Sequence, residues 1–353
     1  RGSPFRRSPE MEVEPFALEL ARPLVTASGT VDRREGFVVR IALGGTPGVG
    51  EATPLPGWTE SLDECRAALD RAGAVADELD WGVALAKVDA PAARHGIALA
   101  LAEARARSRG APLYRTLDST GAGRVENVPV NATLGADGTP SEVADSASEV
   151  VAAGYGCLKV KVGTRGIEAD IERVRAVRNA VGDAITLRVD ANGSWTREEA
   201  GRAVEALAAL DVAYVEQPLP AADLDGTVEL RGRGLDIALD ESLVVHDVET
   251  VIEADAADVL VLKPMVVGGP DLAVSATRRC REVGVEPVVS TTVDAVVART
   301  GAVHVAASIP DVRPCGLATG DRIVRDLAPD PAPVADGAIR VPQGPGLGLE
   351  ARP

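Results

Sequence analysis

The sequence predicts a (β/α)8-type barrel with an N-terminal α+β capping domain that the C-terminal tail completes. From Val128 onward, short β-branched apolar runs alternate with helical stretches rich in Ala, Glu and Arg, and most runs end in a polar residue. From Lys161 onward, successive polar ends lie 29, 26, 24, 23 and 27 residues apart, which suits one strand and one crossover helix per unit. About eight such units fit a barrel, whose active site lies at the C-terminal ends of the strands.

The expected barrel strands can be placed one by one. Their polar ends are Val130-Asn131, Lys159-Val160-Lys161, Asp190, Glu216, Asp240, Lys263 and Ser290, with a weaker eighth strand near Cys315-Gly316-Leu317. An open doubly wound sheet is the alternative, but it would favour a Gly-rich phosphate turn after its first strand, and none is present. Residues 45–50 have the wrong order of glycines for such a turn and are expected to form a hairpin turn instead.

The chain divides into three expected parts. Residues 1–10 precede the first Met, contain three Arg and no apolar run, and are expected to be an added or upstream extension. Residues 11–125, together with 330–353, form the α+β capping domain, in which strand-like runs precede two Ala-rich amphipathic stretches. Residues 126–329 form the catalytic barrel. The two amphipathic stretches are 61–80 and 91–109.

Composition excludes several classes of protein. At 353 residues, 46% apolar and 25% charged, the chain has a globular composition, and its net charge of −16 argues against a nucleic-acid partner. No apolar stretch is long enough to predict a membrane span. The four cysteines are scattered without a zinc or disulfide pattern, so a reducing cytoplasm is expected. The acidic surplus with few lysines predicts a halophilic protein, the alternative being an ordinary acidic surface encoded by a GC-rich genome.

Lysine is scarce in this chain, and its few positions are informative. Of 37 basic residues only four are lysines, namely Lys87, Lys159, Lys161 and Lys263. Two of them lie two residues apart within one apolar run. Because lysine is otherwise so rare in this chain, we expect that Lys159 and Lys161 are kept in this run for the chemistry of the amine itself.

Three carboxylates end three consecutive predicted strands. Asp190, Glu216 and Asp240 should therefore converge on one side of the barrel mouth. Taken singly, each could cap a helix or lie in a solvated loop. Together they would repel one another unless a cation neutralised them, and oxygen-only ligands suit Mg²⁺, with Mn²⁺ as a substitute. The sequence therefore predicts a metal site.

The lysines at strand ends flank these carboxylates. Because side chains alternate along a strand, Lys159 and Lys161 should both face the barrel interior, with Lys263 across the ring. Lys159 is expected to pair with the carboxylates. An amine that is partly desolvated beside other cations has a lowered pKa and can act as a general base, a role we assign to Lys161. Such a site suits removal of the proton beside a carboxylate group, with Mg²⁺ stabilising the enediolate.

The chain resembles the muconate-lactonizing subgroup of the enolase superfamily over nearly its whole length. The resemblance rests on five motifs. They are Lys159-Val-Lys161, Arg188-Val-Asp190-Ala-Asn192, Val215-Glu216-Gln217-Pro218, Asp240-Glu241-Ser242-Leu243 and Lys263-Pro264.

Two further segments, 50–58 and 316–320, look like those of o-succinylbenzoate synthases. This resemblance implies a lyase that dehydrates 2-succinyl-6-hydroxy-2,4-cyclohexadiene-1-carboxylate to o-succinylbenzoate in menaquinone biosynthesis. By the same resemblance Lys161 abstracts the proton, Lys263 stabilises the enediolate, and the segment from Thr26 to Arg34 is a loop that closes over the site. The implied substrate contacts are Ser290, Thr291, Gly316, Asn192 and Arg188.

Other functions stay open. A dipeptide epimerase, an N-acylamino acid racemase or a muconate-type cycloisomerase would use the same lysines and metal, and a catalytically silent barrel is a third class. Dipeptide epimerases carry an Asp-x-Asp pair on the last strand, and residues 317–321 lack it. The expected partner is a small-molecule carboxylate, and homo-oligomerisation is left open. His95, His246 and His304 are expected to be packing or surface residues.

Overall fold

The computed structural model describes residues 11–26, 29–117 and 123–349. Its N-terminal part is an antiparallel sheet in the order β1-β2-β3. The strands are β1 (Met11–Thr26), β2 (Gly29–Leu43) and β3 (Thr46–Ala52). The predicted loop from residue 26 to 34 was wrong, because residues 29–34 belong to β2 and pair with β1. Residues 27–28 of that segment lie outside the described residues.

The turn between β2 and β3 is tighter than the predicted segment 45–50. Gly44 and Gly45 form it, with φ values of 59° and 84°. Gly48 and Gly50 instead lie within β3, where a Cβ on Gly50 would be 1.9 Å from the carbonyl oxygen of Gly96. These glycines let helix α3 lie directly on the sheet, which fixes the cap as a thin two-layer unit.

Four helices complete the cap. They are α1 (Leu62–Glu78), α2 (Trp81–Ala86), α3 (Pro91–Ser108) and α4 (Leu113–Leu117). The two longer ones match the predicted stretches 61–80 and 91–109. Helix α1 begins at a capping box, in which Ser61 and Glu64 each accept a hydrogen bond from the other's backbone amide. Helix α3 is buried along most of its length between the sheet and α1.

The second part contains a curled sheet of seven parallel strands, in the chain order β5 to β11. The strands are β5 (Ala132–Leu134), β6 (Cys157–Lys161), β7 (Thr186–Asp190), β8 (Val212–Glu216), β9 (Asp236–Leu239), β10 (Val259–Leu262) and β11 (Glu286–Val289). The predicted strand ends match within one residue, except that the first strand of this sheet begins only at Ala132, after the predicted end at Asn131. Strand order and direction confirm the predicted fold class.

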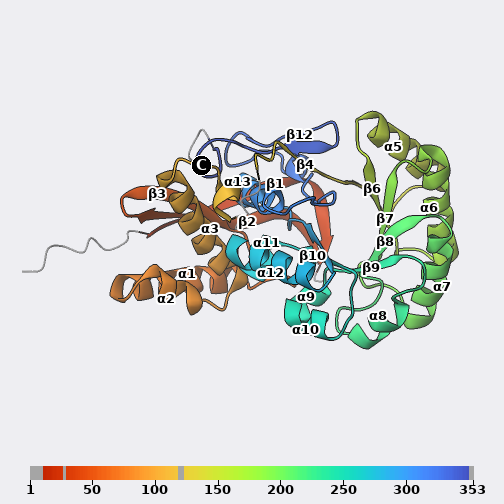
Figure 1. Cartoon of the computed structure of the whole chain (residues 1–353), viewed down its shortest axis with the longest axis horizontal. Coiled ribbons are helices and arrows are strands. Elements are labelled where there is room, and N and C mark those ends of the chain that lie inside the picture. The colour runs from red at the N-terminus through yellow and green to blue at the C-terminus, as the bar shows by residue number, and fades with distance from the viewer. Residues whose placement is uncertain (1–10, 27–28, 118–122, 350–353) are drawn as a thin grey trace, which may run out of the picture.

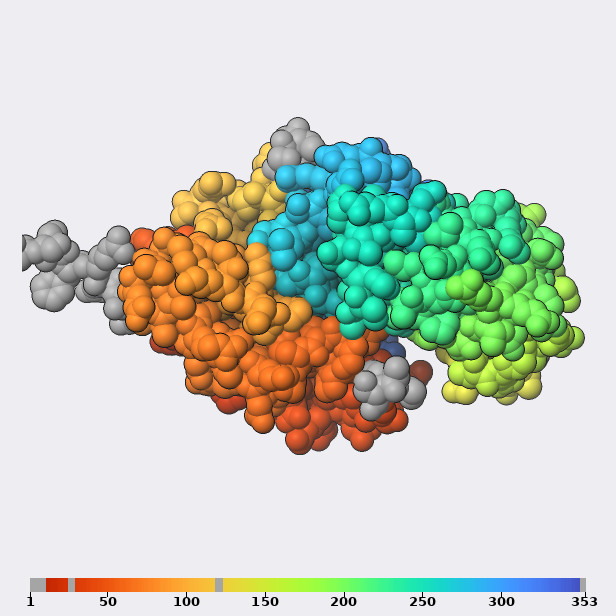
Figure 2. All heavy atoms as spheres, turned by 90° about the horizontal axis from the view of Figure 1, so that it is seen from below, coloured from red at the N-terminus to blue at the C-terminus, as the bar shows by residue number. Residues whose placement is uncertain are grey.

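Helices cover the outer face of this sheet, as Figure 1 shows for α5 to α8 around β6 to β9. They are α5 (Pro140–Ala152), α6 (Ile167–Val181), α7 (Arg197–Ala208), α8 (Leu224–Leu230), α9 (Ser242–Val245), α10 (Val248–Glu253), α11 (Pro264–Val267), α12 (Pro270–Glu282) and α13 (Val296–Ala307). Val160, Val189 and Val215 point outward from their strands into a fully buried cluster beneath these helices. In the space-filling view of Figure 2, the cap and the green part of the barrel lie at opposite ends, with the later blue segments between them.

The expected eighth strand is present only as two isolated bridges. Cys315 bridges to Val130 at one edge of the sheet, and Gly316 bridges to Ser290 at the other. The amide of Asn131 donates to the Cys315 carbonyl at 3.0 Å, and that of Gly316 donates to the Val289 carbonyl at 2.9 Å. This short segment therefore joins the two edges of the curled sheet.

The tail contacts both parts of the molecule. After the 3-10 helix Gly320–Arg322, strands β12 (Val334–Ala335) and β13 (Ala338–Arg340) form an antiparallel sheet with β4 (Asn127–Pro129). Farther on, the carbonyl of Gly346 accepts the amide of Leu113 in the cap at 2.7 Å, and Leu347 and Leu349 pack with Val38. The predicted domain boundaries remain predictions, since the tail serves both parts.

Among the described residues, every helix is too short or too polar to cross a bilayer.

Candidate active site

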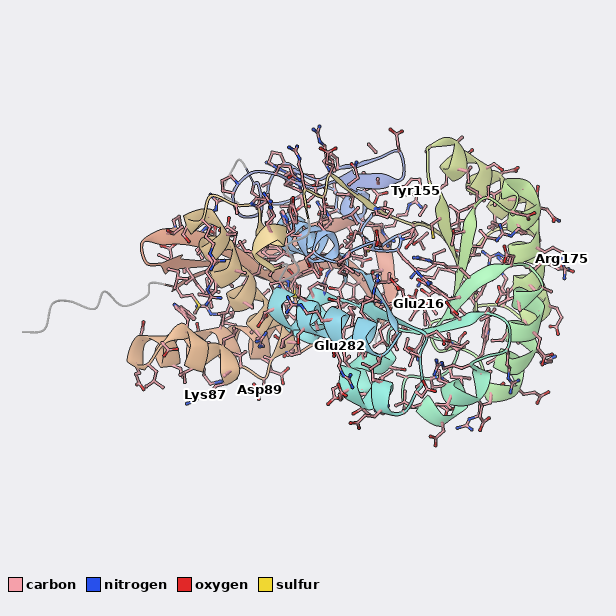
Figure 3. All side chains as sticks on the ribbon, in the orientation of Figure 1. Lys87, Asp89, Tyr155, Arg175, Glu216 and Glu282 are labelled. Atoms are coloured by element: carbon pink, nitrogen blue, oxygen red, sulfur yellow. The ribbon has the colours of Figure 1, made fainter. Side chains whose placement is uncertain are left out.

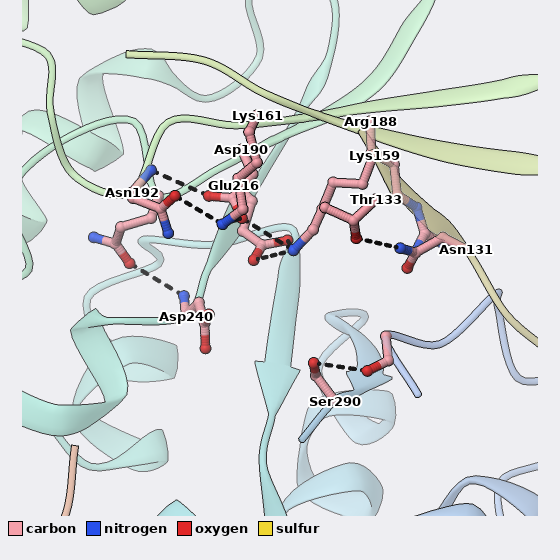
Figure 4. Close-up of polar contacts among 12 residues, drawn as sticks. Asn131, Thr133, Lys159, Lys161, Arg188, Asp190, Asn192, Glu216, Asp240 and Ser290 are labelled. Atoms are coloured by element: carbon pink, nitrogen blue, oxygen red, sulfur yellow. Dashed lines mark hydrogen bonds and ion pairs between the residues drawn. The ribbon is translucent and has the colours of Figure 1, made fainter. Parts of the chain in front are cut away.

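Strand register brings the predicted residues to one end of the sheet. Lys161 of β6 is paired with Asp190 of β7, and Asp190 is paired with Glu216 of β8. Asp240 and Lys263 follow immediately after β9 and β10. Lys159 and Lys161 are two residues apart on β6, and Asp190 is the register partner of Lys161. The three side chains therefore share the interior face. Figure 4 shows them converging at the strand ends.

Lys159 neutralises two of the carboxylates. Its Nζ lies 3.0 Å from Oδ2 of Asp190 and 2.8 Å from Oε1 of Glu216. Burial acts to lower the pKa of Lys159, but Asp190 and Glu216 outweigh it and raise that pKa well above its usual value. Lys159 is thus held as a cation, in agreement with the pairing role that the sequence suggested.

The two neighbouring carboxyl groups respond in opposite ways to this crowding. Burial and, after it, the neighbouring charge of Asp190 raise the pKa of Glu216 to about 8, although Lys159 acts to lower it. For Asp190, burial is outweighed by Lys159 and Lys161, which hold its pKa below the usual range. Crowding of buried acids at this end of the sheet thus disfavours the ionised form of Glu216.

Lys161 lies nearer the open end of the site. Its side chain is 30% exposed, against 14% for Lys159. The ammonium donates to Oδ2 of Asp190 at 2.7 Å and to Oδ1 of Asn192 at 2.8 Å. These contacts hold the amine where a bound molecule could reach it.

Lys263 approaches from the other side of the carboxylates. Its Nζ donates to Oδ2 of Asp240 at 2.6 Å and lies 3.4 Å from the centre of the Trp58 ring, which belongs to the cap. A narrow pocket beneath Trp58 is lined by Asp240, Leu243 and Lys263 among others. Lys263 therefore lies between a carboxylate and an aromatic face, and both attract an ammonium group.

Gln217 ties together the strand ends that carry the acids. Its Oε1 accepts the amides of Asp240 and Ser242 at 3.1 and 3.0 Å, and its Nε2 donates to the Leu219 carbonyl and to Oγ of Ser242. The backbone of Gln217 has a φ of 42°, which a side chain rarely adopts without such support. Gln217 thereby fixes Asp240 relative to Glu216.

Arg173 of α6 secures the end of β6 in a similar way. Its Nη1 donates to the Lys161 carbonyl at 3.0 Å, and its Nη2 donates to the Gly135 carbonyl at 2.6 Å. Arg173 is fully buried and forms an ion pair with Asp170, which in turn accepts the amide of Gly163 at 2.7 Å. The helix therefore determines where the backbone of the proposed base lies.

Three of the predicted substrate contacts lie together at the junction of β11 and the eighth segment. Ser290 Oγ donates to the Gly316 carbonyl at 3.1 Å, and the hydroxyls of Thr291 and Thr319 are 3.0 Å apart. A Cβ on Gly316 would lie 2.6 Å from Ser290 Oγ, so a larger residue here would displace the Ser290 hydroxyl. Their roles as substrate contacts remain predictions.

Arg188 and Asn192, also predicted to contact substrate, have other neighbours here. Arg188 is 1% exposed and donates to the Pro314 carbonyl at 2.6 Å, with its guanidinium 4.7 Å from the Tyr214 ring centre. We therefore no longer include Arg188 among the proposed substrate contacts, because the barrel interior holds it. Asn192 accepts a hydrogen bond from Lys161, and its role as a substrate contact stays a prediction.

The three carboxylates offer the oxygen ligands that Mg²⁺ prefers, but in this structure each of them contacts a lysine. Within the described parts of the chain, no three carboxylate, imidazole or thiolate groups meet at metal-binding distance. Asp190 and Glu216 face Lys159, and Asp240 faces Lys263. Their oxygen-only chemistry fits a hard cation, which carboxylate oxygens can bind while a lysine still contacts the same group.

Several residues of the site had no role in the sequence interpretation. Trp58, Gln217 and Glu241 stood within quoted segments or motifs without a role of their own. The turn that follows β9 orients Glu241, so the signals in the sequence were its place in a quoted motif and its adjacency to the predicted ligand Asp240. Lys87, the remaining lysine, lies on the cap surface far from Glu216, as Figure 3 shows.

A parallel barrel under a separate antiparallel cap, with acids and lysines at its strand ends, defines a class of capped barrel enzymes. The enolase C-terminal domain-like family matches residues 142–353. The chain belongs to this family and is an enzyme of the enolase superfamily, as the motifs had indicated.

Relatives within the family have different activities. The hydrophobic dipeptide epimerase of Enterococcus faecalis is 31% identical over 85% of this chain and 86% of its own length. The o-succinylbenzoate synthase of Thermobifida fusca is 39% identical, over 61% of this chain and 67% of its own length. The crystal structure of the E. faecalis dipeptide epimerase with Mg and L-Leu-L-Tyr has a TM-score of 0.86 at 29% identity, covering 97% of this chain and 99% of that one.

Proposed function

We propose that the chain is a Mg²⁺-dependent o-succinylbenzoate synthase. The observation that supports this chemistry, which the alternative activities share, is that the three lysines of the site have different surroundings. Lys159 is held as a cation by two carboxylates, whereas Lys161 and Lys263 approach from opposite sides, one exposed toward the open end and the other beneath Trp58. Such an arrangement can take a proton from one face of a bound molecule while a fixed positive charge stabilises the anion from the other.

In the proposed reaction, Lys161 as a neutral amine removes the proton beside the carboxylate of the cyclohexadiene substrate. The electron pair left behind expels the hydroxyl group from the adjacent carbon, and the lysine returns the proton to it, so that water leaves and the ring becomes aromatic. Lys263 stabilises the negative charge that develops in between. Asp190, Glu216 and Asp240 would hold Mg²⁺, which when bound would neutralise charge on the substrate carboxylate.

A dipeptide epimerase is the second candidate, because relatives with that activity span more of the chain. Besides the E. faecalis protein, the L-Ala-D/L-Glu epimerase of Bacillus subtilis is 29% identical over 96% of this chain. Against this candidate stands the end of the eighth segment, where Thr319 contacts Thr291 and no Asp-x-Asp pair is present in residues 317–321. The synthase is therefore our first proposal.

One panel separates the two. The Mg²⁺-loaded protein is incubated with the cyclohexadiene carboxylate and, in parallel, with dipeptides and N-acylamino acids in D₂O. Rapid aromatisation without deuterium incorporation into the amino-acid compounds supports the synthase, and the reverse result contradicts it. Lys161→Ala should abolish turnover with the fold intact, while Lys87→Ala, a matched change of an exposed lysine outside the site, should leave it unchanged. Equal activity of both variants would contradict the role of Lys161.

A further inference from the structure

A chain of two hydrogen bonds connects Lys161 to an acid that the proposed reaction does not use. Lys161 Nζ donates to Oδ1 of Asn192 at 2.8 Å, and Nδ2 of Asn192 donates to Oε1 of Glu241 at 2.8 Å. The second oxygen of Glu241 is buried and has no hydrogen-bond partner among the described residues. Asn192 thus lies between an ammonium and a carboxylate, on the loop that follows β7.

These two hydrogen bonds fix which way the Asn192 amide points. A carboxylate only accepts hydrogen bonds, so the amide nitrogen must face Glu241 and the amide oxygen must face Lys161. The backbone of Asn192 is also held, since its amide donates to Oδ1 of Asp190 at 3.1 Å and its φ is 46°. Protonation of the unpartnered oxygen of Glu241 would still leave Oε1 as an acceptor.

A fixed amide has a consequence for the amine. Besides its bond to Cε, the Nζ of Lys161 has three tetrahedral directions, and two of them point to Asp190 and Asn192. In the neutral amine, two N–H groups can satisfy these acceptors, which leaves the lone pair in the third direction. Without Asn192 in this orientation, the amine could rotate and turn its lone pair away from a bound substrate.

We propose that Glu241 and Asn192 are positioning residues that orient the amine of Lys161 for proton transfer. The inference rests on the proposed function, in which Lys161 is the base. It reassigns Asn192 from the predicted substrate contact to an orienting role, and it gives Glu241 a function through Asn192 and not through the substrate.

The test exchanges the hydrogen-bond donor and acceptor between positions 192 and 241. Asn192→Asp alone places two carboxylates against each other with no proton between them, so the side chain at position 192 should turn away from Glu241 and no longer hold Lys161 in its present position. Adding Glu241→Gln restores one donor and one acceptor at the same net charge as the natural pair, so the fixed position should return. Glu241→Ala, which removes the acceptor, should behave like Asn192→Asp and serves if that variant does not fold. Glu205→Gln, on the exposed face of α7, is the control.

The readout uses the scarcity of lysine. In Mg²⁺-loaded protein carrying ¹³C-labelled lysine, four side chains give Cε signals, and Lys161→Arg identifies that of Lys161. An ordered side chain shows two distinct Hε shifts, which merge when it rotates freely. The pair should merge in Asn192→Asp and Glu241→Ala and separate again in the double variant. In turnover, Asn192→Asp should lower kcat about 10-fold or more with little change in KM.

The possible outcomes separate this inference from the proposed function. If the Hε pair stays distinct in Asn192→Asp and in Glu241→Ala, or stays merged in the folded double variant, the positioning role is wrong even where turnover is affected. If Lys161→Arg retains synthase turnover, the proposed function is wrong whatever the spectra show.

Discussion

The ammonium of Lys263 lies 3.4 Å from the centre of the Trp58 ring, so a residue of the cap touches a lysine of the barrel. On its other side the same ammonium donates to Asp240. The contact links the segment after β3 to the end of β10, and these two strands belong to different sheets. It means that the cap helps to determine the surroundings of a proposed catalytic cation.

Replacing Trp58 should therefore affect catalysis more than stability. A cation–π contact contributes about 0.5 to 2 kcal/mol, so Trp58→Leu should lower kcat/KM by roughly 2-fold to 30-fold. Trp58→Phe, which keeps a smaller aromatic face, should fall between the two. Steady-state kinetics with thermal unfolding on the same samples checks this. Equal kcat/KM for all three proteins would contradict a role of the ring.

Arg173→Met should destabilise the fold by about 3 to 5 kcal/mol, because it leaves the buried carboxylate of Asp170 without its ion-pair partner. The change also removes the hydrogen bond to the Lys161 carbonyl. Urea unfolding measures the loss. The control is Arg202→Met, which breaks an exposed pair with Glu168 at 3.4 Å and should cost less than about 1 kcal/mol. Similar losses in the two variants would contradict this account of Arg173.

Magnesium should raise the melting temperature of the protein, and EDTA should reverse the effect. A cation that binds only the folded state stabilises it in proportion to the logarithm of its concentration over Kd. Asp240→Asn should reduce the shift sharply, whereas Asp211→Asn, outside the site, should not. A shift that is equal in both variants would show that Mg²⁺ binds elsewhere.

His304 should make the protein less stable in acid. Burial lowers its pKa to about 4, from a usual value of 6.5. Its Nδ1 accepts the amide of Tyr114, so a proton there would face another N–H group. Because the folded-state pKa is lowered, this contribution to stability is fully present above about pH 6.5 and is lost as the pH falls toward 4.

The expected loss across that interval is roughly 3 kcal/mol, from a difference of about 2.5 pKa units. The measurement is the free energy of unfolding against pH for the natural protein and for His304→Gln. The variant should show a flatter slope between pH 4 and 6.5 and the same slope above pH 7. Parallel curves throughout would mean that another group causes the acid sensitivity.

The halophilic character predicted from the net charge of −16 also has a direct test. Stability should rise from low salt to molar KCl as the self-repulsion of the acidic surface is screened. Melting temperatures along a KCl series measure this. A flat or falling series would favour the alternative of an ordinary acidic surface.

Regular spacing made most of the barrel predictable. Each unit repeats a β-branched run and a helix, so the ends of β6 to β11 were located from the polar residue that closes each run. Lys161, Asp190 and Glu216 could be placed together because parallel register is nearly determined once the units are counted. The same reasoning failed for the eighth segment, where only isolated bridges form and little strand pattern remains.

Contacts between distant segments could not be predicted from sequence patterns. The pairing of Trp58 with Lys263 depends on how the cap docks, which no local periodicity encodes. The orientation of Glu241 toward Asn192 depends on the turn after β9. The segment 29–34 was misinterpreted as a loop because its charged residues do not show a strand pattern. The strand is recognisable only from its pairing with β1.

The two bridges at Cys315 and Gly316 have a consequence for biosynthesis. The ring of strands closes only when a segment near the end of the chain reaches Val130, more than half the chain away. A nascent chain on the ribosome therefore carries an open sheet whose two edges are unpaired until the last part emerges. During that time the edge strands β5 and β11 are exposed to pairing with other chains, so chaperone protection would matter most late in translation.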